Sequence, residues 1–440
     1  MPMRITDAEE EEGLYPINEK TIKIKGSLRI IIMVMIVGVV GLLLAHDSIN
    51  FATLRETKDL SIKQTNAGCQ FPAIFNFGDS NSDTGTESAA FGRLPLPFGQ
   101  TFFGKPSGRR CDGRLIIDFI AERLRMPYLS AYLDSIGSNF RHGSNFASSG
   151  SSIMEMPCTN QLLDLGTQLR QFQQFKQRIA ESHHQGGNWL YLRNFLPRRQ
   201  DFSKALYIID SGQNDLYYAL KWKTEKQVKA NIPNIIDHIG LVIETLYQEG
   251  ARIFWIHNTG PIGCLPIMVK NNPPKHGNSD QNGCLVSYNE LAKDFNSHLL
   301  DKIIKLRTQI QDALIIYVDI YSAKYSLINQ AKKLGFMDPL QSCCEPLKGG
   351  ILLNEIENKR DNVIESHGSC CSNPSEYIAW DSIHYTEAAN QWVANFIMSG
   401  SFSDPPIAVT EAACANQTRG TQNLKVEEKQ RNARLGSFLN

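Results

Sequence analysis

Apolar residues recur along the chain after residue 70 in two alternating patterns. Short runs rich in β-branched and aromatic side chains predict buried strands, and longer stretches with apolar residues three and four positions apart predict helices. The predicted strands are 72–77, a short one leading into 143–150, 204–210, 252–257 and 313–320. The predicted helices are 115–124, 162–179, 224–250, 291–303 and 385–398.

Two of these helices have recognisable boundaries. Thr224 and Gln227 have the spacing of a capping box, and Gly250 follows the apolar stripe that begins after them. Pro233 falls inside this stripe, so we expect a kink or a second helix start at that point. The helix at 385–398 is expected to begin directly after His384.

Strands that alternate with amphipathic helices predict an α/β fold, with a mainly parallel sheet covered by helices on both faces. No motif recurs with the period of about 20–50 residues that marks a solenoid. The chain has 440 residues, of which 42% are hydrophobic, enough for one large domain with tails. We expect this domain to span residues 69–414.

The N-terminal region differs from the rest in composition. Residues 1–29 form a charged arm, residues 30–45 an uncharged apolar run, and residues 46–68 a linker. The apolar run has a length between those of a signal peptide and a spanning helix, so both a cleaved signal and a signal anchor are open. Either way, the basic residues before the run keep the N-terminus cytosolic and send the domain into the lumen or outside.

Cysteine usage agrees with an oxidising compartment. The sequence has 10 cysteines, all of them after the apolar run. The sequon at Asn416 predicts a glycosylation site, and residues 415–440 read as a disordered charged tail. We therefore expect a secreted, extracellular protein, with a membrane-anchored protein of the secretory pathway as the alternative.

Charge and cysteine spacing exclude two classes of partner. The 45 basic and 45 acidic residues give a net charge of zero, so no basic excess is available for nucleic acid. No Cys-x-x-Cys pair is present, and neighbouring cysteines are poor tetrahedral ligands for zinc. We expect no metal and no cofactor, and the sequence leaves the oligomeric state open.

The first predicted strand ends abruptly at Gly78-Asp79-Ser80. Ligands of open α/β sheets bind at the carboxyl ends of the strands, which is where Ser80 falls. By itself the tripeptide is most often a turn. Its interpretation changes because Asn214 follows the strand at 204–210, and Asp381 lies three residues before His384.

These residues provide the groups that an activated serine needs. Imidazole titrates near neutral pH, so His384 is the candidate base for the Ser80 hydroxyl, and Asp381 would orient the imidazole ring. The backbone amides of Ser80 and Gly150, together with the Asn214 side chain, are candidate donors to an oxyanion. The Gly-x-Ser-x-Gly elbow of α/β-hydrolases is absent from the sequence.

Four ordered blocks resemble the SGNH, or GDSL, hydrolase family, and the plant-type esterases and lipases are the branch most similar. The blocks are Gly78-Asp79-Ser80, Asn145-Phe146-Ala147 with Gly150, Gly212-x-Asn214-Asp215 and Asp381-x-x-His384. The resemblance implies a flavodoxin-like three-layer α/β/α fold and hydrolysis of carboxylic esters, such as acetyl or other acyl esters of small molecules or the cell wall, without a metal. It also implies that Ser80, Gly150, Asn214 and His384 are the four name-giving residues.

Some positions depart from the family pattern. Asn81 replaces the leucine of the name-giving tetrapeptide, Ser382 stands where glycine is usual, and Glu345 follows the Cys343-Cys344 pair in place of glycine. The disulfide pairing in that region is therefore open. Three other functions also remain: an acyltransferase using the same site, a catalytically inactive binding protein, and a glycosidase that would pair Asp79 with Asp381.

Overall fold

The computed structural model describes residues 69–155, 163–182, 189–274, 277–346 and 367–415. Six strands form its main sheet in the order β2-β1-β3-β4-β5-β8. The first five are parallel to one another, and β8 is antiparallel to β5. Their bounds are β1 Ile74–Gly78, β2 Gly143–Asn145, β3 Leu206–Asp210, β4 Ile253–His257, β5 Leu314–Val318 and β8 Ser403–Asp404. This order with one added edge strand is the doubly wound, flavodoxin-like topology expected from the sequence.

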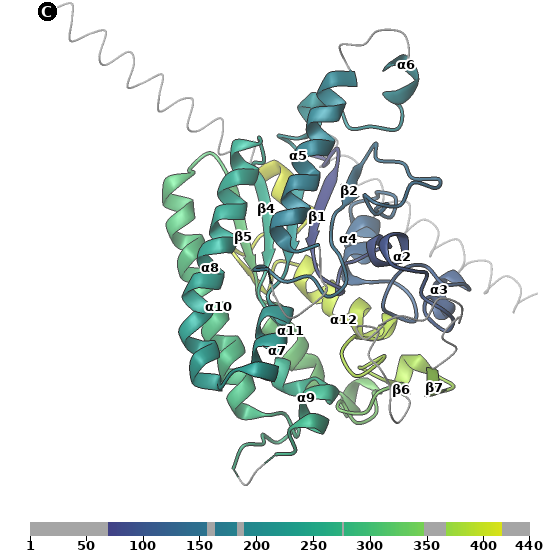
Figure 1. Cartoon of the computed structure of the whole chain (residues 1–440), viewed down its shortest axis with the longest axis vertical. Helices are drawn as coiled ribbons and strands as arrows, with labels where there is room; N and C mark the ends of the chain where they lie inside the picture. Colours follow the sequence, from purple (N-terminus) through teal and green to yellow (C-terminus); the bar gives the residue numbers. More distant parts are fainter. Residues whose placement is uncertain (1–68, 156–162, 183–188, 275–276, 347–366, 416–440) are drawn as a thin grey trace, which may run out of the picture. The chain divides into compact units, whose positions relative to one another are not determined.

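Helices cover both faces of the sheet (Figure 1). The longest are α5 Leu165–Ser182, α8 Glu225–Gln248 and α10 Val286–Gln309. Others are α4 Ile116–Arg123, α7 Gln213–Trp222, α9 Pro266–Asn271, α11 Ile320–Asn329 and α12 Glu387–Met398. The shortest are α2 Thr86–Ala90, α3 Gln100–Phe103 and α6 Trp189–Leu192.

Strands β1, β3, β4 and β5 each supply side chains to two separate cores, because successive residues of a strand point to opposite faces. Phe75 and Phe77 of β1 pack in a core with α5, α8 and α10. Ile74 of the same strand packs in a second core with α4, α11 and α12. The strands are buried along their length on both faces, which explains why their sequences are continuous apolar runs.

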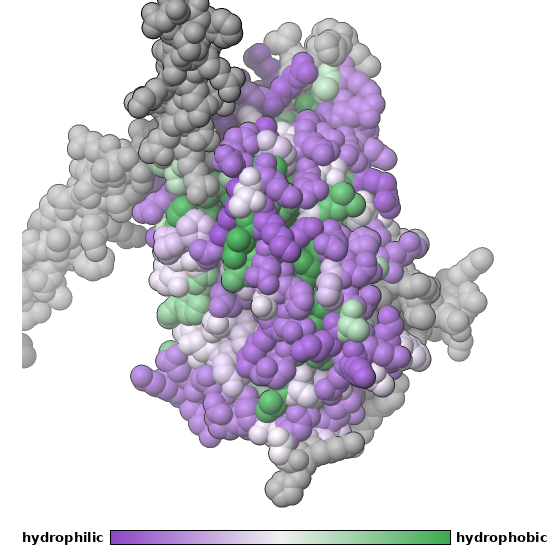
Figure 2. Space-filling view, turned by 90° about the vertical axis from the view of Figure 1, so that its left-hand side faces the viewer, coloured by the Kyte–Doolittle hydropathy of each residue, from purple (hydrophilic) through white to green (hydrophobic). Residues whose placement is uncertain are grey.

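The outer surface over α8 and α10 is mostly hydrophilic (Figure 2). Apolar residues appear there only as small, scattered groups among hydrophilic ones. This is the expected surface of amphipathic helices whose apolar stripes face a sheet.

Two details of the helices differ from the expectation. α8 continues through Pro233 as one helix, so the expected second start is absent. Thr224 caps it, and its Oγ1 accepts a hydrogen bond from the Gln227 amide at 3.3 Å. α12 begins at Glu387 and not at Tyr385, because the Thr386 side chain accepts from the Ala389 amide and serves as the N-cap.

Four disulfides join distant parts of the described chain. They are Cys69–Cys414, Cys264–Cys284, Cys343–Cys371 and Cys344–Cys370. The last two tie the small antiparallel sheet of β6 Cys344–Pro346 and β7 His367–Cys370, and so answer the open question of pairing around Cys343 and Cys344. Cys111 is a buried free thiol.

Several expectations concern residues outside the described part. These are the arm at 1–29, the apolar run at 30–45, the linker at 46–68, the sequon at Asn416 and the tail. Among the described residues, no helix has the length and apolar character needed to cross a membrane.

Candidate active site

The carboxyl ends of three neighbouring strands bring the first candidate residues to one edge of the sheet. β1 lies between β2 and β3. Ser80 follows the end of β1, Gly150 follows β2, and Asn214 stands near the start of α7, directly beyond β3. The Ser148 amide donates to the Gly78 carbonyl at 3.1 Å, and the Asp79 amide donates to the Asp210 carbonyl at 3.2 Å.

Gly78 holds the end of β1 in a conformation that requires glycine. Its φ is +150°, and an added Cβ would lie 2.2 Å from the carbonyl oxygen of Asp210. Gln168 of α5 holds this turn in place through its side-chain amide. Its Oε1 accepts a hydrogen bond from the Gly78 amide at 2.9 Å. Its Nε2 donates to the Gly78 carbonyl and to the Ser151 hydroxyl, both at 2.8 Å. Gln168 was missed in the sequence, although it is a fully buried polar residue among the apolar positions of α5.

Asp83 organises the loop after Ser80. Its carboxylate accepts from the amides of Gly85 and Thr86 at 2.8 and 2.7 Å, and from the amide of Ser149 at 2.8 Å. Burial raises the pKa of this carboxyl group against the opposing effect of the hydrogen bonds. The contact with Ser149 ties the Ser80 loop to the loop that carries Gly150.

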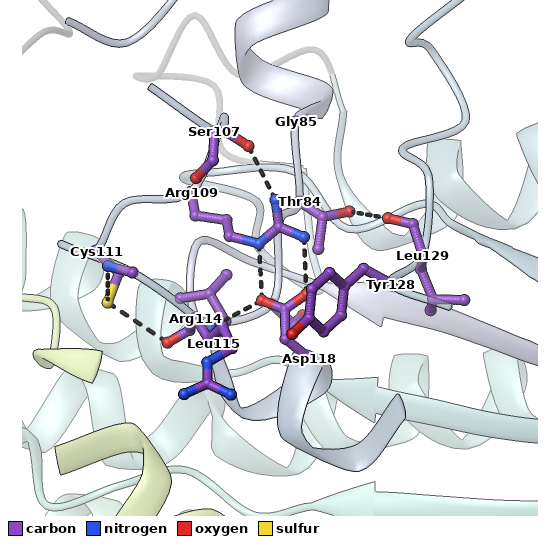
Figure 3. A network of polar contacts seen from close by, with 12 residues as sticks. Thr84, Gly85, Ser107, Arg109, Cys111, Arg114, Leu115, Asp118, Tyr128 and Leu129 are labelled. Atoms are coloured by element: carbon purple, nitrogen blue, oxygen red, sulfur yellow. Dashed lines mark hydrogen bonds and ion pairs between the residues drawn. The ribbon is translucent and has the colours of Figure 1, made fainter. Parts of the chain in front are cut away.

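A buried ion pair anchors the next loop against the same region (Figure 3). The Arg109 guanidinium binds the Asp118 carboxylate through two bonds of 2.7 Å, and its Nη1 donates to the Ser107 carbonyl at 2.9 Å. Thr84 donates to the Leu129 carbonyl at 2.9 Å in the same view. The bidentate geometry fixes the position of the loop that leads into Arg110.

Arg110 forms an ion pair with Glu87 of α2 beside the other candidate residues. The Arg110 charge and a hydrogen bond from Ser149 lower the pKa of Glu87 although burial opposes this, and His384 contributes to the same lowering. Asp381 in turn helps to raise the pKa of Arg110. These mutual effects place the pair within electrostatic reach of Asp381 and His384.

Asn214 and its neighbour Asp215 hold the loop at 150–154. The Asn214 side-chain amide donates to the Ser151 carbonyl at 2.9 Å, which leaves its second N–H for another acceptor. The Asp215 carboxylate accepts from the amides of Ile153 and Met154, at 2.9 and 3.2 Å. Burial raises the pKa of Asp215 to about 7. Gly150 has a φ of +77°, the left-handed conformation that glycine adopts without strain.

Asp381 and His384 meet in one tight turn. Asp381 Oδ2 lies 2.7 Å from His384 Nδ1, while Oδ1 accepts from the amides of Ile383 and His384 at 2.8 and 2.7 Å. Burial would raise the pKa of Asp381, but the charge of His384 and these hydrogen bonds lower it below its usual value. An ionised Asp381 keeps the proton on Nδ1 and leaves Nε2 as the basic nitrogen.

Ser80 and His384 are both nearly buried, at 5% and 6% exposure. Among the contacts of the described residues, no hydrogen bond joins the Ser80 hydroxyl to the imidazole. Catalytic hydrogen bonds are often long before substrate binds, so the absence of this bond does not by itself exclude His384 as the base.

A second group of polar residues includes Asp79, which directly precedes Ser80. We call this group the buried cluster, and its members are Asp79, Asp210, His257 and Lys324. All four are at most 9% exposed. Burial and the charge of Asp210 raise the pKa of Asp79 to about 8. Asp210 keeps a lowered pKa despite burial, because of His257 and Lys324. His257 Nδ1 lies 3.3 Å from Asp210 Oδ2.

Lys324 connects the buried cluster to the other half of the site. Its Nζ lies 4.8 Å from the ring centroid of Tyr385, the residue after His384. Burial lowers the pKa of Lys324, while Asp210 and Asp79 oppose that shift. Sequence reasoning did not find Lys324, because a lysine within a helix gives no sign of facing inward.

Potential metal ligands gather at one place in the described part of the chain, at Cys264, Asp280 and Cys284. The two cysteines form a disulfide with each other, so their sulfur atoms are unavailable as thiolate ligands.

Comparison with known proteins identifies the family. The model of the GDSL-like Lipase/Acylhydrolase family matches residues 74–397, which include all the blocks described above. The chain belongs to this family. A GDSL esterase/lipase of Arabidopsis thaliana is 46% identical over 362 residues, covering 81% of this chain and 92% of the relative. A second from the same plant is 48% identical over 357 residues, covering 79% and 92%.

One relative carries a different name. Alpha-L-fucosidase 3 of Arabidopsis thaliana is 45% identical over 347 residues, covering 76% of this chain and 91% of the relative. The family and the relatives named as esterases identify the protein as a carboxylic ester hydrolase, as predicted from the sequence.

Proposed function

We propose that the protein is a serine esterase in which Ser80 is the nucleophile, His384 the general base and Asp381 the residue that orients His384. The observation that carries this proposal is the Asp381–His384 pair, with a 2.7 Å contact on Nδ1 and two further hydrogen bonds that keep the carboxylate ionised. Such a pair leaves Nε2 free to accept the serine proton.

The reaction then proceeds in two steps. His384 Nε2 takes the proton as Ser80 Oγ attacks the ester carbonyl, and the protonated imidazole returns it to the leaving alcohol. Water repeats the sequence on the acyl-enzyme and releases the acid. The amides of Ser80 and Gly150 and the second N–H of Asn214 donate to the oxyanion in both steps. An alcohol in place of water would make the same site an acyltransferase.

A covalent probe tests the nucleophile. We expect a fluorophosphonate to add to Ser80 in the folded protein, with the modified peptide identified by mass spectrometry, and to abolish hydrolysis of 4-nitrophenyl acetate. Ser82→Ala is the matched control, because Ser82 is 3% exposed in the same loop and its hydroxyl has no partner within the described residues. Labelling of another residue, or none with activity intact, would refute the assignment.

The acyl group and the alcohol define the finer specificity. We propose acetyl or another acyl group on a small-molecule or cell-wall alcohol, following the plant relatives named as esterases and lipases. A panel of acetyl, short-chain and long-chain esters measured as kcat/KM ranks these substrates. A preference for long chains would replace the acetyl proposal with lipase specificity.

A glycosidase is a second candidate because one relative bears the name Alpha-L-fucosidase 3. Asp79 would be one of its two carboxyl groups, yet it is 1% exposed and its electrostatic neighbours are Asp210 and Lys324 of the buried cluster. We therefore expect no hydrolysis of 4-nitrophenyl α-L-fucoside by the enzyme that hydrolyses 4-nitrophenyl acetate. Release of nitrophenol that persists in Ser80→Ala would establish the glycosidase.

We also propose export through the secretory pathway. Four disulfides are typical of an oxidising compartment. In this proposal residues 30–45 are a cleaved signal, residues 69–414 the hydrolase domain, and Asn416 a glycosylation site. Mass spectrometry of the mature protein is expected to find a first residue between about 46 and 70. Recovery of residues 1–29 in a membrane fraction would support the signal anchor instead.

A further inference from the structure

A cavity of about 410 Å³ lies at the opposite edge of the sheet from Ser80. Its lining residues are Arg141, Arg193, Asn194 and Arg198. Arg141 stands before the start of β2, and Arg198 stands before β3, so both precede strands whose other ends face the candidate active site. Figure 1 shows neighbouring α6 at the top of the view, far from α7 and α12. The volume is in the range of small-ligand sites, about 300–1,000 Å³.

Contacts within the protein fix part of the cavity wall. The Phe140 amide donates to the Phe195 carbonyl at 2.9 Å and joins the two segments that form it. Arg141 Nη1 binds Asp201 Oδ2 at 2.7 Å, and the same oxygen accepts from the Arg198 amide at 2.9 Å. The Asp201 side chain is only 6% exposed. Arg141 and the backbone at Arg198 are therefore already in place for a ligand, which lowers part of the entropy cost of binding.

The cavity carries an excess of positive charge. Asp201 balances Arg141, but Arg193 and Arg198 form no ion pair in the part of the chain that the structure describes. No lining residue is apolar. The whole chain has a net charge of zero, so this excess is a local feature. Guanidinium groups present planar pairs of donors that match a carboxylate or a phosphate.

Two exposed aromatic rings lie in the segment that contains Arg193 and Asn194. Tyr191 is 70% exposed and Phe195 38%, and their ring centroids are 5.3 Å apart. The two rings pack against each other and remain accessible to a ligand. Sugar rings have apolar C–H faces that pack against such rings, while their substituents reach polar groups at the side.

We propose that this cavity binds a uronic-acid unit of an acidic polysaccharide, with its carboxylate on Arg193 and Arg198 and its ring against Tyr191 and Phe195. The site holds the enzyme on an acidic polymer and takes no part in bond cleavage. Polar walls exclude an acyl chain, and the exposed rings of Tyr191 and Phe195 in the same segment favour a sugar acid over a phosphate group alone. The proposal stands on this cavity alone and does not depend on the catalytic residues.

The test measures binding of the full-length protein to polygalacturonate by affinity gel electrophoresis. We expect wild type to be retarded by polygalacturonate, and much less by the same polymer after methyl esterification. Arg193→Ala/Arg198→Ala should weaken binding at least about tenfold, since each charged hydrogen bond contributes about one tenfold factor or more. Tyr191→Ala should weaken it by a smaller factor, about threefold. Hydrolysis of 4-nitrophenyl acetate should stay unchanged in all of them.

Arg178→Ala/Arg199→Ala is the matched control, because it removes the same charge from two exposed arginines that do not line the cavity. We expect it to bind like wild type. Equal loss in this control would show non-specific attraction and overturn the proposal, as would absence of retardation in wild type. Competition by inorganic phosphate as strong as that by galacturonate would overturn the uronate assignment. Arginine-dependent binding to phosphatidylserine vesicles but not to polygalacturonate would establish a membrane site instead.

Discussion

Two carboxyl groups next to the candidate catalytic residues have pKa values shifted in opposite directions. Asp381, in the turn that contains His384, accepts three hydrogen bonds, and its pKa is below the usual value in spite of burial. Asp79, directly before Ser80, accepts hydrogen bonds from Asn81 on Oδ1 only, and its Oδ2 has no partner among the described residues. Burial and Asp210 raise the pKa of Asp79 to about 8.

Hydrogen-bond donors and partial exposure together favour a charged Asp381, whereas Asp79 is fully buried and has the second carboxyl group of Asp210 near it. Burial by itself favours the neutral acid, and it is more complete for Asp79, which is 1% exposed, than for the Asp381 side chain, which is 25% exposed. The turn at 381–384 supplies enough N–H groups to stabilise an anion, and an anion is what a protonated His384 needs beside it. In the buried cluster the one buried cation, Lys324, faces two carboxyl groups, so Asp210 takes the charge and Asp79 keeps its proton.

Removing the side chain of His384 or of Ser80 should have the largest effect on turnover. We expect His384→Ala and Ser80→Ala each to lower kcat by at least about 10³, because each removes one half of a proton-transfer unit. The double variant should lose little more than either single one. Stopped assays on 4-nitrophenyl acetate measure these values, with thermal unfolding as the check that the fold persists. Retention of more than a few per cent of activity in Ser80→Ala would contradict the proposed mechanism.

Asn214 provides a neutral hydrogen-bond donor at the carboxyl end of the strands, where Ser80 also lies. Asn214→Ala should lower kcat by roughly 10²–10³ with KM nearly unchanged, because its second N–H acts on charge that develops only in the transition state. Steady-state kinetics separate the two constants. A rise in KM with kcat intact would place Asn214 in substrate binding. Asp215→Asn is a useful control, since it perturbs the 150–154 loop through Ile153 and Met154 without removing the Asn214 amide.

The sequence predicted the strands, the main helices and the turn at 381–384, because these depend on local periodicity and on spacing within one segment. It did not predict β8 or the β6–β7 pair, whose strands have two to four residues and show no periodicity. Pro233 was expected to mark a kink or a second helix start, and α8 shows no second start, since buried residues on both sides of Pro233 belong to one helix.

The parts of the site that escaped prediction all depend on long-range contacts. Gln168 is 90 residues from Gly78, and nothing local to either indicates that they meet. The same holds for Lys324 and the buried cluster, whose members come from β3, β4, α11 and the residue that follows β1. Chemistry that lies within one turn, as in Asp381-x-x-His384, can be recognised from spacing, whereas chemistry assembled across the sheet needs the fold.

Removing the cation of the buried cluster should reduce stability more than turnover. Lys324→Met leaves Asp210 with His257 alone, and we expect a loss of about 3 kcal/mol in the free energy of unfolding, with kcat reduced less than tenfold. Urea denaturation measures the loss. Lys332→Met is the matched control, because Lys332 is exposed and should change stability by less than about 0.5 kcal/mol. Equal effects of the two substitutions would mean that Lys324 does not stabilise the cluster.

The smallest effect on turnover is expected for Asp79→Asn, which tests whether the Asp79 carboxyl group is protonated. Asparagine is close in shape to the neutral acid and keeps the acceptor that Asn81 uses, so kcat at pH 7 should be nearly unchanged.

The pKa of Asp79 is raised from 3.8 to about 8, so the folded protein binds this proton more tightly than the unfolded chain. Its contribution to stability is therefore complete below about pH 4 and is lost as pH rises through about 8. The groups that face it, Asp210 and Lys324, remain in the variant. Thermal unfolding from pH 5 to 9 should show a steeper fall for wild type than for Asp79→Asn. Parallel curves would mean that Asp79 is already ionised, and that the buried cluster, like the turn at 381–384, stabilises an anion next to a candidate catalytic residue.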